Sequence, residues 1–131
     1  MAVVNATKGK LGKISFYNAT AAGAENRQWP LGLFTVDQDG VPLTKEFEIK
    51  HSTHPKGDKR DEWSQGPAGV AISIILKGGF RFTVAPNGID GEIVTNEIGP
   101  GEAILWENTV PHKWESLEDG TEVITVRRLE K

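Results

Sequence analysis

The stretch Gly99-Pro-Gly-Glu-Ala-Ile-Leu-Trp-Glu-Asn-Thr-Val-Pro-His-Lys-Trp114 decides the fold of this chain. Gly101 can take a positive φ in a tight turn, and the apolar run 103–106 that follows favours a short strand. Pro111 fixes its own φ and keeps Val110 extended, so His112 enters the next strand at a defined angle. The stretch therefore predicts two strands joined by a proline-containing turn, with His112 at the start of the second.

The rest of the chain consists of short apolar segments separated by turn residues. Its 131 residues suit one domain, and the 15 glycines and 7 prolines are spread along it rather than gathered in a linker. A short helical turn is expected within 18–27. Strands are expected at 13–17, 31–36, 45–51, 69–77, 80–84, 92–98, 103–106 and 122–128. Many short strands without a long helix predict an all-β fold, either an antiparallel sandwich or a barrel.

Alternation along these strands predicts which side chains face the core. The adjacent glycines Gly78 and Gly79 are typical of a two-residue hairpin turn, so strand 69–77 is expected to pair with strand 80–84. Strands 31–36 and 45–51, which the turn residues 37–40 and Pro42 separate, are expected to form a hairpin or its long-looped equivalent. Residues 52–69 are polar and rich in glycine and proline, which indicates a long loop of the kind that is often functional. The residues expected to face the core are Val70, Ile72, Ile74, Leu76, Phe80, Phe82 and Val84, with Phe47, Ile49 and His51 on the preceding strand.

The spacing of Gly101 and His112 resembles the second conserved motif of the cupin superfamily. The segment Leu76-Lys-Gly-Gly-Phe80 resembles the turn that follows the first motif of the same family. Three positions depart from the family pattern, namely Glu107, Thr109 and Ser116. The resemblance implies a cupin-type double-stranded β-helix, an antiparallel jelly-roll barrel, over residues 30–128 of a single domain 1–131. It also implies that the N-terminal extension, 1–29, pairs with a second subunit in a homodimer.

The first cupin motif, which supplies two histidines and a glutamate to a metal ion, is degenerate here. Ala71 stands where the glutamate belongs, and the histidines nearest to the motif, His51 and His54, lie upstream of it. The segment His54-Pro-Lys-Gly-Asp-Lys-Arg-Asp-Glu-Trp63 is similar to a motif of small cupin-like bacterial proteins, mostly of unknown function. His54 is therefore either a ligand or proton carrier at the barrel mouth, or a loop histidine hydrogen-bonded to backbone.

A metal ion would need about three protein ligands. His54 and His112, with one of His51, Glu102 and Glu107, could supply them, and such a set suits iron, nickel, zinc or manganese. The alternative is that the chain holds no cofactor.

A ligand site is predicted around His112, because the cupin template points this residue into the barrel lumen as the central polar group. Arg60 offers a guanidinium fork that suits a carboxylate or phosphate, and Trp63 and Trp114 can form an aromatic wall. Trp106 is assigned to the core, and no Ser-His-Asp triad is evident. The predicted ligand-binding residues are His112, Trp114, Arg60 and Trp63, whereas Arg81 and Arg127 are assigned to the surface.

Three functions fit the sequence. The leading one is a cupin barrel that binds a small polar or aromatic molecule in its lumen, which does not require catalysis. The alternatives are a metal-dependent enzyme of the oxygenase or isomerase type, with His54 and His112 as ligands, and a non-catalytic dimeric interaction module. The 15 basic and 18 acidic residues give a net charge of −3, which argues against nucleic acid or membrane as partners. The absence of cysteine and of an N-terminal leader favours a cytoplasmic location.

Overall fold

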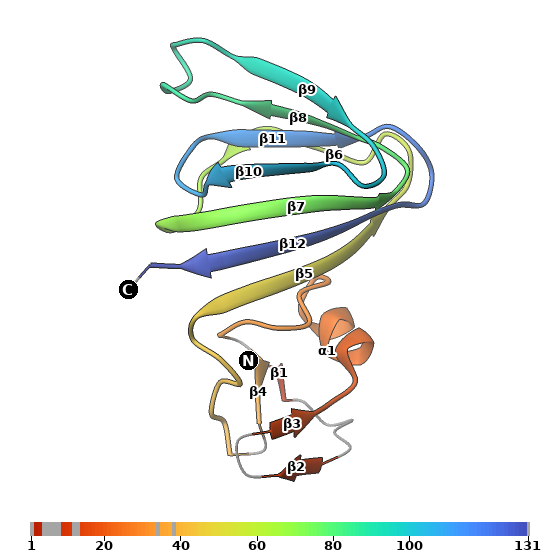
Figure 1. Cartoon of the computed structure of the whole chain (residues 1–131), viewed down its shortest axis with the longest axis vertical. Coiled ribbons are helices and arrows are strands. Elements are labelled where there is room, and N and C mark those ends of the chain that lie inside the picture. The colour runs from red at the N-terminus through yellow and green to blue at the C-terminus, as the bar shows by residue number, and fades with distance from the viewer. Residues whose placement is uncertain (1, 4–8, 12–13, 34, 38, 131) are drawn as a thin grey trace.

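The computed structural model describes residues 2–3, 9–11, 14–33, 35–37 and 39–130, with side chains from residue 17 onward. Most of these residues form a barrel of antiparallel strands, and a smaller N-terminal part hangs below the barrel (Figure 1). Among the described residues, no helix is long and apolar enough to cross a membrane. The elements in chain order are β1 (Ala2–Val3), β2 (Gly9–Leu11), β3 (Ile14–Phe16), α1 (Ala19–Glu25), β4 (Thr35–Val36), β5 (Phe47–His54), β6 (Lys59–Ser64), β7 (Gly69–Lys77), β8 (Phe80–Val84), β9 (Val94–Ile98), β10 (Ala103–Glu107), β11 (His112–Ser116) and β12 (Thr121–Leu129).

The barrel is built from two four-stranded sheets that enclose the core. One sheet has the strand order β10-β7-β12-β5 and the other β6-β11-β8-β9, and every neighbouring pair is antiparallel. Between the sheets, the buried side chains of Ile75, Phe80, Phe82 and Val123 form one apolar cluster. This arrangement confirms the predicted all-β jelly-roll barrel.

The N-terminal part is held together by short pairings within the chain. Strand β1 runs parallel to β4, and β2 pairs with β3. Helix α1 begins after Asn18, whose side chain accepts a hydrogen bond from the backbone N–H of Ala21, and it lies within the predicted helical turn. The predicted hairpin between strands 31–36 and 45–51 is wrong, because β4 pairs with β1. Leu31 alone forms a bridge with Ile49 of β5. Residue 13 of the predicted first strand lies outside the described residues.

The predicted Gly78-Gly79 hairpin is also wrong. Strand β7 lies between β10 and β12, whereas β8 lies between β11 and β9 of the other sheet, so the two glycines carry the chain from one sheet to the next. Gly78 has a φ of 80°, and a Cβ atom on it would collide with Thr121 at the start of β12. The positive φ expected at Gly101 is confirmed, at 82°. A jelly-roll corner therefore uses the same glycine chemistry as a hairpin.

The side of each strand that faces inward differs from the prediction on two strands. On β7 the buried residues are Gly69, Ala71, Ser73 and Ile75, whereas Leu76 is 46% exposed. On β5 the buried residues are Glu48, Ser52 and His54, whereas the Phe47 and His51 side chains face outward. The burial predicted for Phe80 and Phe82 is confirmed. The rule that apolar residues face inward fails on β5 and β7 because the interior of this barrel is a polar cavity.

The predicted long loop at 52–69 is wrong as well. It contains the end of β5, a tight turn in which Gly57 has a φ of 85°, and the whole of β6. Strand β6 pairs with β11, with Trp114 opposite Arg60 and His112 opposite Ser64. The segment therefore places Arg60 next to the strand that carries the predicted ligand site.

Candidate ligand-binding lumen

A cavity of about 300 Å³ lies between the two sheets. Its deepest walls are the buried side chains of Ser52, Ser73 and Val123, and its outer rim includes the exposed side chains of Arg27 and Arg60. The volume lies at the lower end of the range for small-molecule pockets. The burial gradient gives the cavity a floor of small and apolar groups and a mouth of charged ones.

His112 lies on the cavity wall at the first position of β11. Its Nδ1 atom is 2.8 Å from the carbonyl oxygen of Val110, so Nδ1 carries the proton and Nε2 is left as an acceptor in the neutral ring. Burial lowers the pKa of His112, the hydrogen bond to Val110 opposes this shift, and the charges of Arg60 and Arg127 lower the pKa further. The imidazole is therefore held neutral, in a single tautomer, as a hydrogen-bond acceptor.

Aromatic rings line the cavity around His112 and His54. The Trp114 ring stacks on Phe80, with ring centres 5.0 Å apart, and the Trp106 ring lies 5.2 Å from the His112 ring. Both tryptophans line the cavity, so Trp106, which the sequence assigned to the core, belongs to its wall. Trp63 is not among the lining residues, because its ring lies under the Lys113 ammonium group, 4.6 Å from it. Trp114 and Trp63 were both predicted to bind a ligand, but the structure places only Trp114 on the cavity wall.

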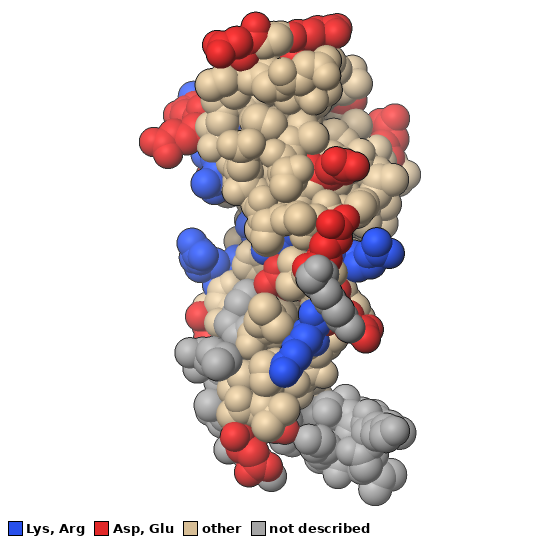
Figure 2. Space-filling view, turned by 90° about the vertical axis from the view of Figure 1, so that its left-hand side faces the viewer, with Lys and Arg blue, Asp and Glu red and all other residues tan. Residues whose placement is uncertain are grey.

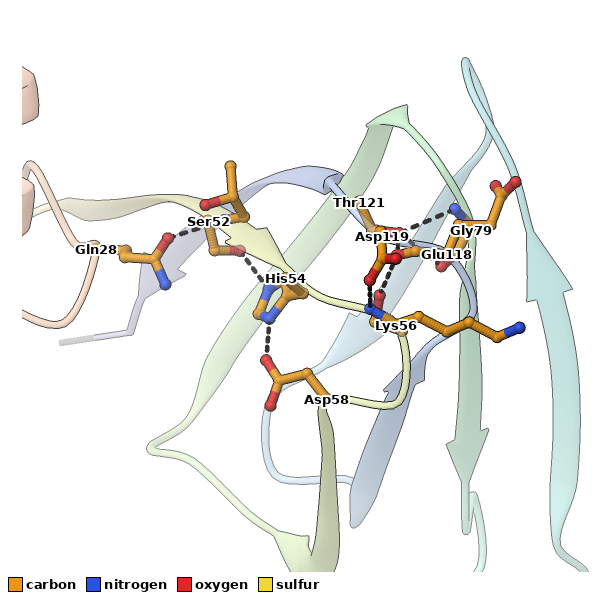
Figure 3. Close-up of polar contacts among 11 residues, drawn as sticks. Gln28, Ser52, His54, Lys56, Asp58, Gly79, Glu118, Asp119 and Thr121 are labelled. Carbon is orange, nitrogen blue, oxygen red and sulfur yellow. Dashed lines mark hydrogen bonds and ion pairs between the residues drawn. The ribbon is translucent and has the colours of Figure 1, made fainter.

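His54 lies inside the barrel at the end of β5, with 6% of its surface exposed. Figure 3 shows its ring between two polar side chains: Nδ1 is 2.7 Å from Oδ2 of Asp58 and Nε2 is 2.9 Å from Oγ of Ser52. A carboxylate can only accept, so in the neutral ring Nδ1 donates to Asp58 and Nε2 accepts the Ser52 proton. His54 is hydrogen-bonded to side chains rather than to backbone, and both of its nitrogens are engaged.

The Ser52-His54-Asp58 arrangement is a feature that the sequence analysis missed. Ser52 and His54 are two residues apart on one strand, so their side chains share a face, and the turn at 55–58 returns Asp58 to the same side. The sequence pattern that indicates this arrangement is Ser-x-His followed by a glycine-containing turn and an aspartate. It was overlooked because the strand was expected to end before His54 and to direct His51 inward. His51 is instead exposed and pairs with Glu122.

Four cationic side chains line the cavity, namely Arg27, Lys50, Arg60 and Arg127. No carboxylate is among the described lining residues. The Arg127 guanidinium donates through Nε and Nη2 to Oε1 of buried Glu48, and it lies 4.6 Å from the centre of the Trp29 ring. In the view of Figure 2, basic and acidic side chains are interspersed around the middle of the molecule. Only Arg60 of this set was predicted, because Lys50 and Arg127 were expected on outward faces.

The donor set of the lumen does not fit the predicted metal ligands. Both His54 nitrogens are occupied, Ala71 offers no donor, and His112 has one nitrogen left. Within the described part of the chain, no three His, Asp or Glu side chains are grouped closely enough to hold an ion. The predicted pair His54 and His112 therefore shares the cavity wall without forming a coordination set.

Solved structures similar to this chain share its barrel. Oxalate decarboxylase from Bacillus subtilis is 18% identical over 69% of this chain and 23% of its own, with a TM-score of 0.57, and Mn(II) centres are described in that enzyme. KdgF from a Halomonas species is 19% identical over 70% of this chain and 77% of its own, with a TM-score of 0.55. A conserved Streptococcus pyogenes protein of unknown function is 21% identical over 70% and 71% of the two chains, with a TM-score of 0.53.

These likenesses concern the fold, because all three identities are low. No protein-family model and no curated protein sequence matches the chain. The chain spans less than a quarter of the oxalate decarboxylase chain that it resembles. The strand order and these structural neighbours show that this chain has a cupin-type jelly-roll fold.

Proposed function

We propose that this chain binds a small polar molecule in its lumen, with His112 as the central hydrogen-bond acceptor and Trp114 as an aromatic wall. The observation that carries the proposal is the cavity itself, which is bounded on one side by a neutral imidazole in a fixed tautomer. A fixed acceptor beside aromatic rings orients a ligand that carries a hydroxyl or amide donor on a flat or ring-shaped body. Binding of this kind requires no catalysis.

The pair of tryptophans on the two sides of the barrel wall gives a matched test. Ligands are first found by a thermal-shift screen of small polar compounds at millimolar concentration, and dissociation constants are then measured by calorimetry. Trp114→Phe and His112→Phe should weaken binding about tenfold, since each removes one wall contact or one hydrogen bond. Trp63→Phe is the control, because Trp63 lies outside the cavity. Equal effects of Trp114→Phe and Trp63→Phe, or none from His112→Phe, would contradict lumen binding.

A second candidate function is nucleophilic catalysis, which the Ser52-His54-Asp58 geometry favours. His54 accepts the Ser52 proton and Asp58 orients the ring, which is the order of contacts in serine hydrolases. An attack of Ser52 Oγ on a fluorophosphonate would form an O–P bond and expel fluoride, with the proton passing to His54. Mass spectrometry of the wild type after incubation with such a probe should show the adduct on Ser52, and His54→Gln should abolish it. An unlabelled wild type would leave the three residues as a structural network.

A further inference from the structure

Four cationic side chains line the lumen, and no carboxylate is among the described lining residues. We propose that its ligand is a small acid with at least two negative charges, a dicarboxylate or a phosphate monoester, held at the cavity mouth by Arg27, Lys50, Arg60 and Arg127. The inference rests on the proposed binding function and names the chemical class of the ligand. It concerns the described residues that line the cavity.

The charges around the cavity are poorly compensated. Of the four cations, Arg127 alone forms an ion pair with another described residue, namely Glu48. Burial lowers the pKa of Lys50, and the charges of Arg27, Arg60 and Arg127 lower it further, while Asp58 acts in the opposite direction. Like charges facing one half-buried space destabilise the empty fold. Such a cluster is typical of a site that an anion neutralises.

The backbone that presents Arg27 is strained. Arg27 and Gln28 both lie in the left-handed region, with φ values of 52° and 71°. Residues with a side chain rarely adopt this conformation, and glycine would relieve it at either position. The turn is held because the Gln28 carbonyl accepts from His51 N–H and its side-chain oxygen accepts from Thr53 N–H. The strained turn lowers the stability of the fold, and it places Arg27 and Trp29 at the cavity rim.

The arrangement of the cations suits a doubly charged acid. Arg127 is oriented in advance by Glu48 and Trp29, Lys50 lies deeper on the adjacent strand β5, and Arg60 faces the space from the opposite sheet. Guanidinium forks match the oxygen spacing of carboxylates and phosphates. A space of about 300 Å³ holds roughly ten waters, which corresponds to a compact acid rather than a polymer.

The first experiment compares three compounds of similar size. Isophthalate and phenyl phosphate each carry two acidic charges, and isophthalamide has the shape of isophthalate without charge. Calorimetry at low salt should show that at least one acid binds about a hundredfold more tightly than the amide. Lys50→Gln and Arg60→Gln should each weaken binding of the acid about tenfold. Lys77→Gln, which lies outside the cavity, should leave the affinity for the acid unchanged. The stronger of the two acids identifies carboxylate or phosphate as the natural group.

The second experiment uses the empty protein. Lys50→Gln should raise the melting temperature without ligand, because it removes a half-buried cation from three like charges, and it should lower the stabilisation that inorganic phosphate gives. A Lys50 that served only the fold would give the opposite sign in the first measurement. Calorimetry at alkaline pH in buffers of different ionisation enthalpy should also show proton uptake on binding of the acid, since the anion raises the lowered Lys50 pKa.

The outcomes separate this inference from the proposed function. Isophthalamide could bind as tightly as isophthalate, with binding weakened by Trp114→Phe but not by Lys50→Gln. This result would overturn the proposal of an acidic ligand and would leave the proposal of binding in the lumen intact. The proposal of an acidic ligand is also overturned if phosphate and both acids stabilise the wild type no more than they stabilise Lys50→Gln and Arg60→Gln. Insensitivity of every bound compound to Trp114→Phe and His112→Phe would instead overturn the lumen as the binding site.

Discussion

Nδ1 of His54 lies 2.7 Å from Oδ2 of Asp58, so that the last residue of β5 is tied to the turn that leads into β6. Asp58→Ala would leave a buried imidazole nitrogen without its partner. We expect a loss of about 1–3 kcal/mol in the free energy of unfolding, measured by urea titration. Asp61→Ala is the control, because Asp61 is exposed and pairs only with Lys59 across a surface contact of 3.4 Å. Equal effects of the two substitutions would refute the structural role of the contact.

The pH dependence of stability should reflect His112. Its pKa in the fold is lower than the ordinary value of 6.5, so the unfolded chain binds more protons at this position as the pH falls. The free energy of unfolding should therefore rise with pH up to about 6.5 and fall on acidification below it. His112→Phe should flatten this slope between about pH 5 and pH 7.5. His51→Gln is the exposed control, and an unchanged slope in His112→Phe would contradict the assignment.

The corner between β7 and β8 distinguishes two adjacent glycines. Gly78→Ala forces a side chain into a positive φ and against Thr121, so we expect it to cost about 2 kcal/mol or more. At Gly79 a Cβ atom would meet ordinary van der Waals contacts, the nearest at 3.6 Å, so Gly79→Ala should be nearly neutral. Thermal unfolding of the two variants measures the difference. A more damaging Gly79→Ala would mean that the strained turn is placed one residue away.

The metal content of the purified protein addresses the alternative enzyme function. Because Ala71 offers no donor to the lumen and both His54 nitrogens are engaged, we expect clearly less than one equivalent of iron, nickel, zinc or manganese without added metal. Elemental analysis of the wild type and His112→Ala tests this. One equivalent in the wild type that is lost in His112→Ala would favour the metal-dependent enzyme and require His54 to reorient.

The outer face of the β10-β7-β12-β5 sheet carries one row of apolar side chains, and we expect a second copy of the chain to cover this row. The strand register aligns Leu105, Ile72, Val126 and Ile49 in one row, and Leu105 is 67% exposed. In the next row of the same face, Glu107 lies on β10 and Arg128 lies on β12, on either side of Val70. A two-fold axis parallel to the strands would therefore place Glu107 of one copy beside Arg128 of the other. Light scattering should show a dimer, which Leu105→Glu dissociates. Ile89→Glu, in an exposed turn, is the control, and a monomeric wild type would reject the dimer.

The turn chemistry predicted an all-β sandwich or barrel because it is local, and the resemblance of the Gly101–His112 stretch to a cupin motif selected the jelly-roll barrel. Gly101, Pro111 and the glycines at 78–79 fix where strands end, and those positions are correct even where the partner strand is not. Which strands pair depends on contacts between distant segments of the chain. The apolar sequence of β7 is compatible both with a hairpin and with a corner between two sheets. The inward face of β5 was missed because the polar cavity reverses the usual polarity of a strand's inner face. His112, Trp114 and Arg60 lie on the cavity wall, whereas Lys50, Trp29 and Arg27 needed the three-dimensional arrangement.

Alternate residues of β5 and β12 serve separate surfaces. Positions 48, 50, 52 and 54 face the lumen, and positions 47, 49, 51 and 53 face outward. Exchanges at the first set change the side chains that face the lumen while the outer face keeps its composition. Insertion or deletion of a single residue in either strand would instead interchange the two sets at once. Point substitutions can therefore diversify the lining of this lumen, whereas changes in strand length cannot.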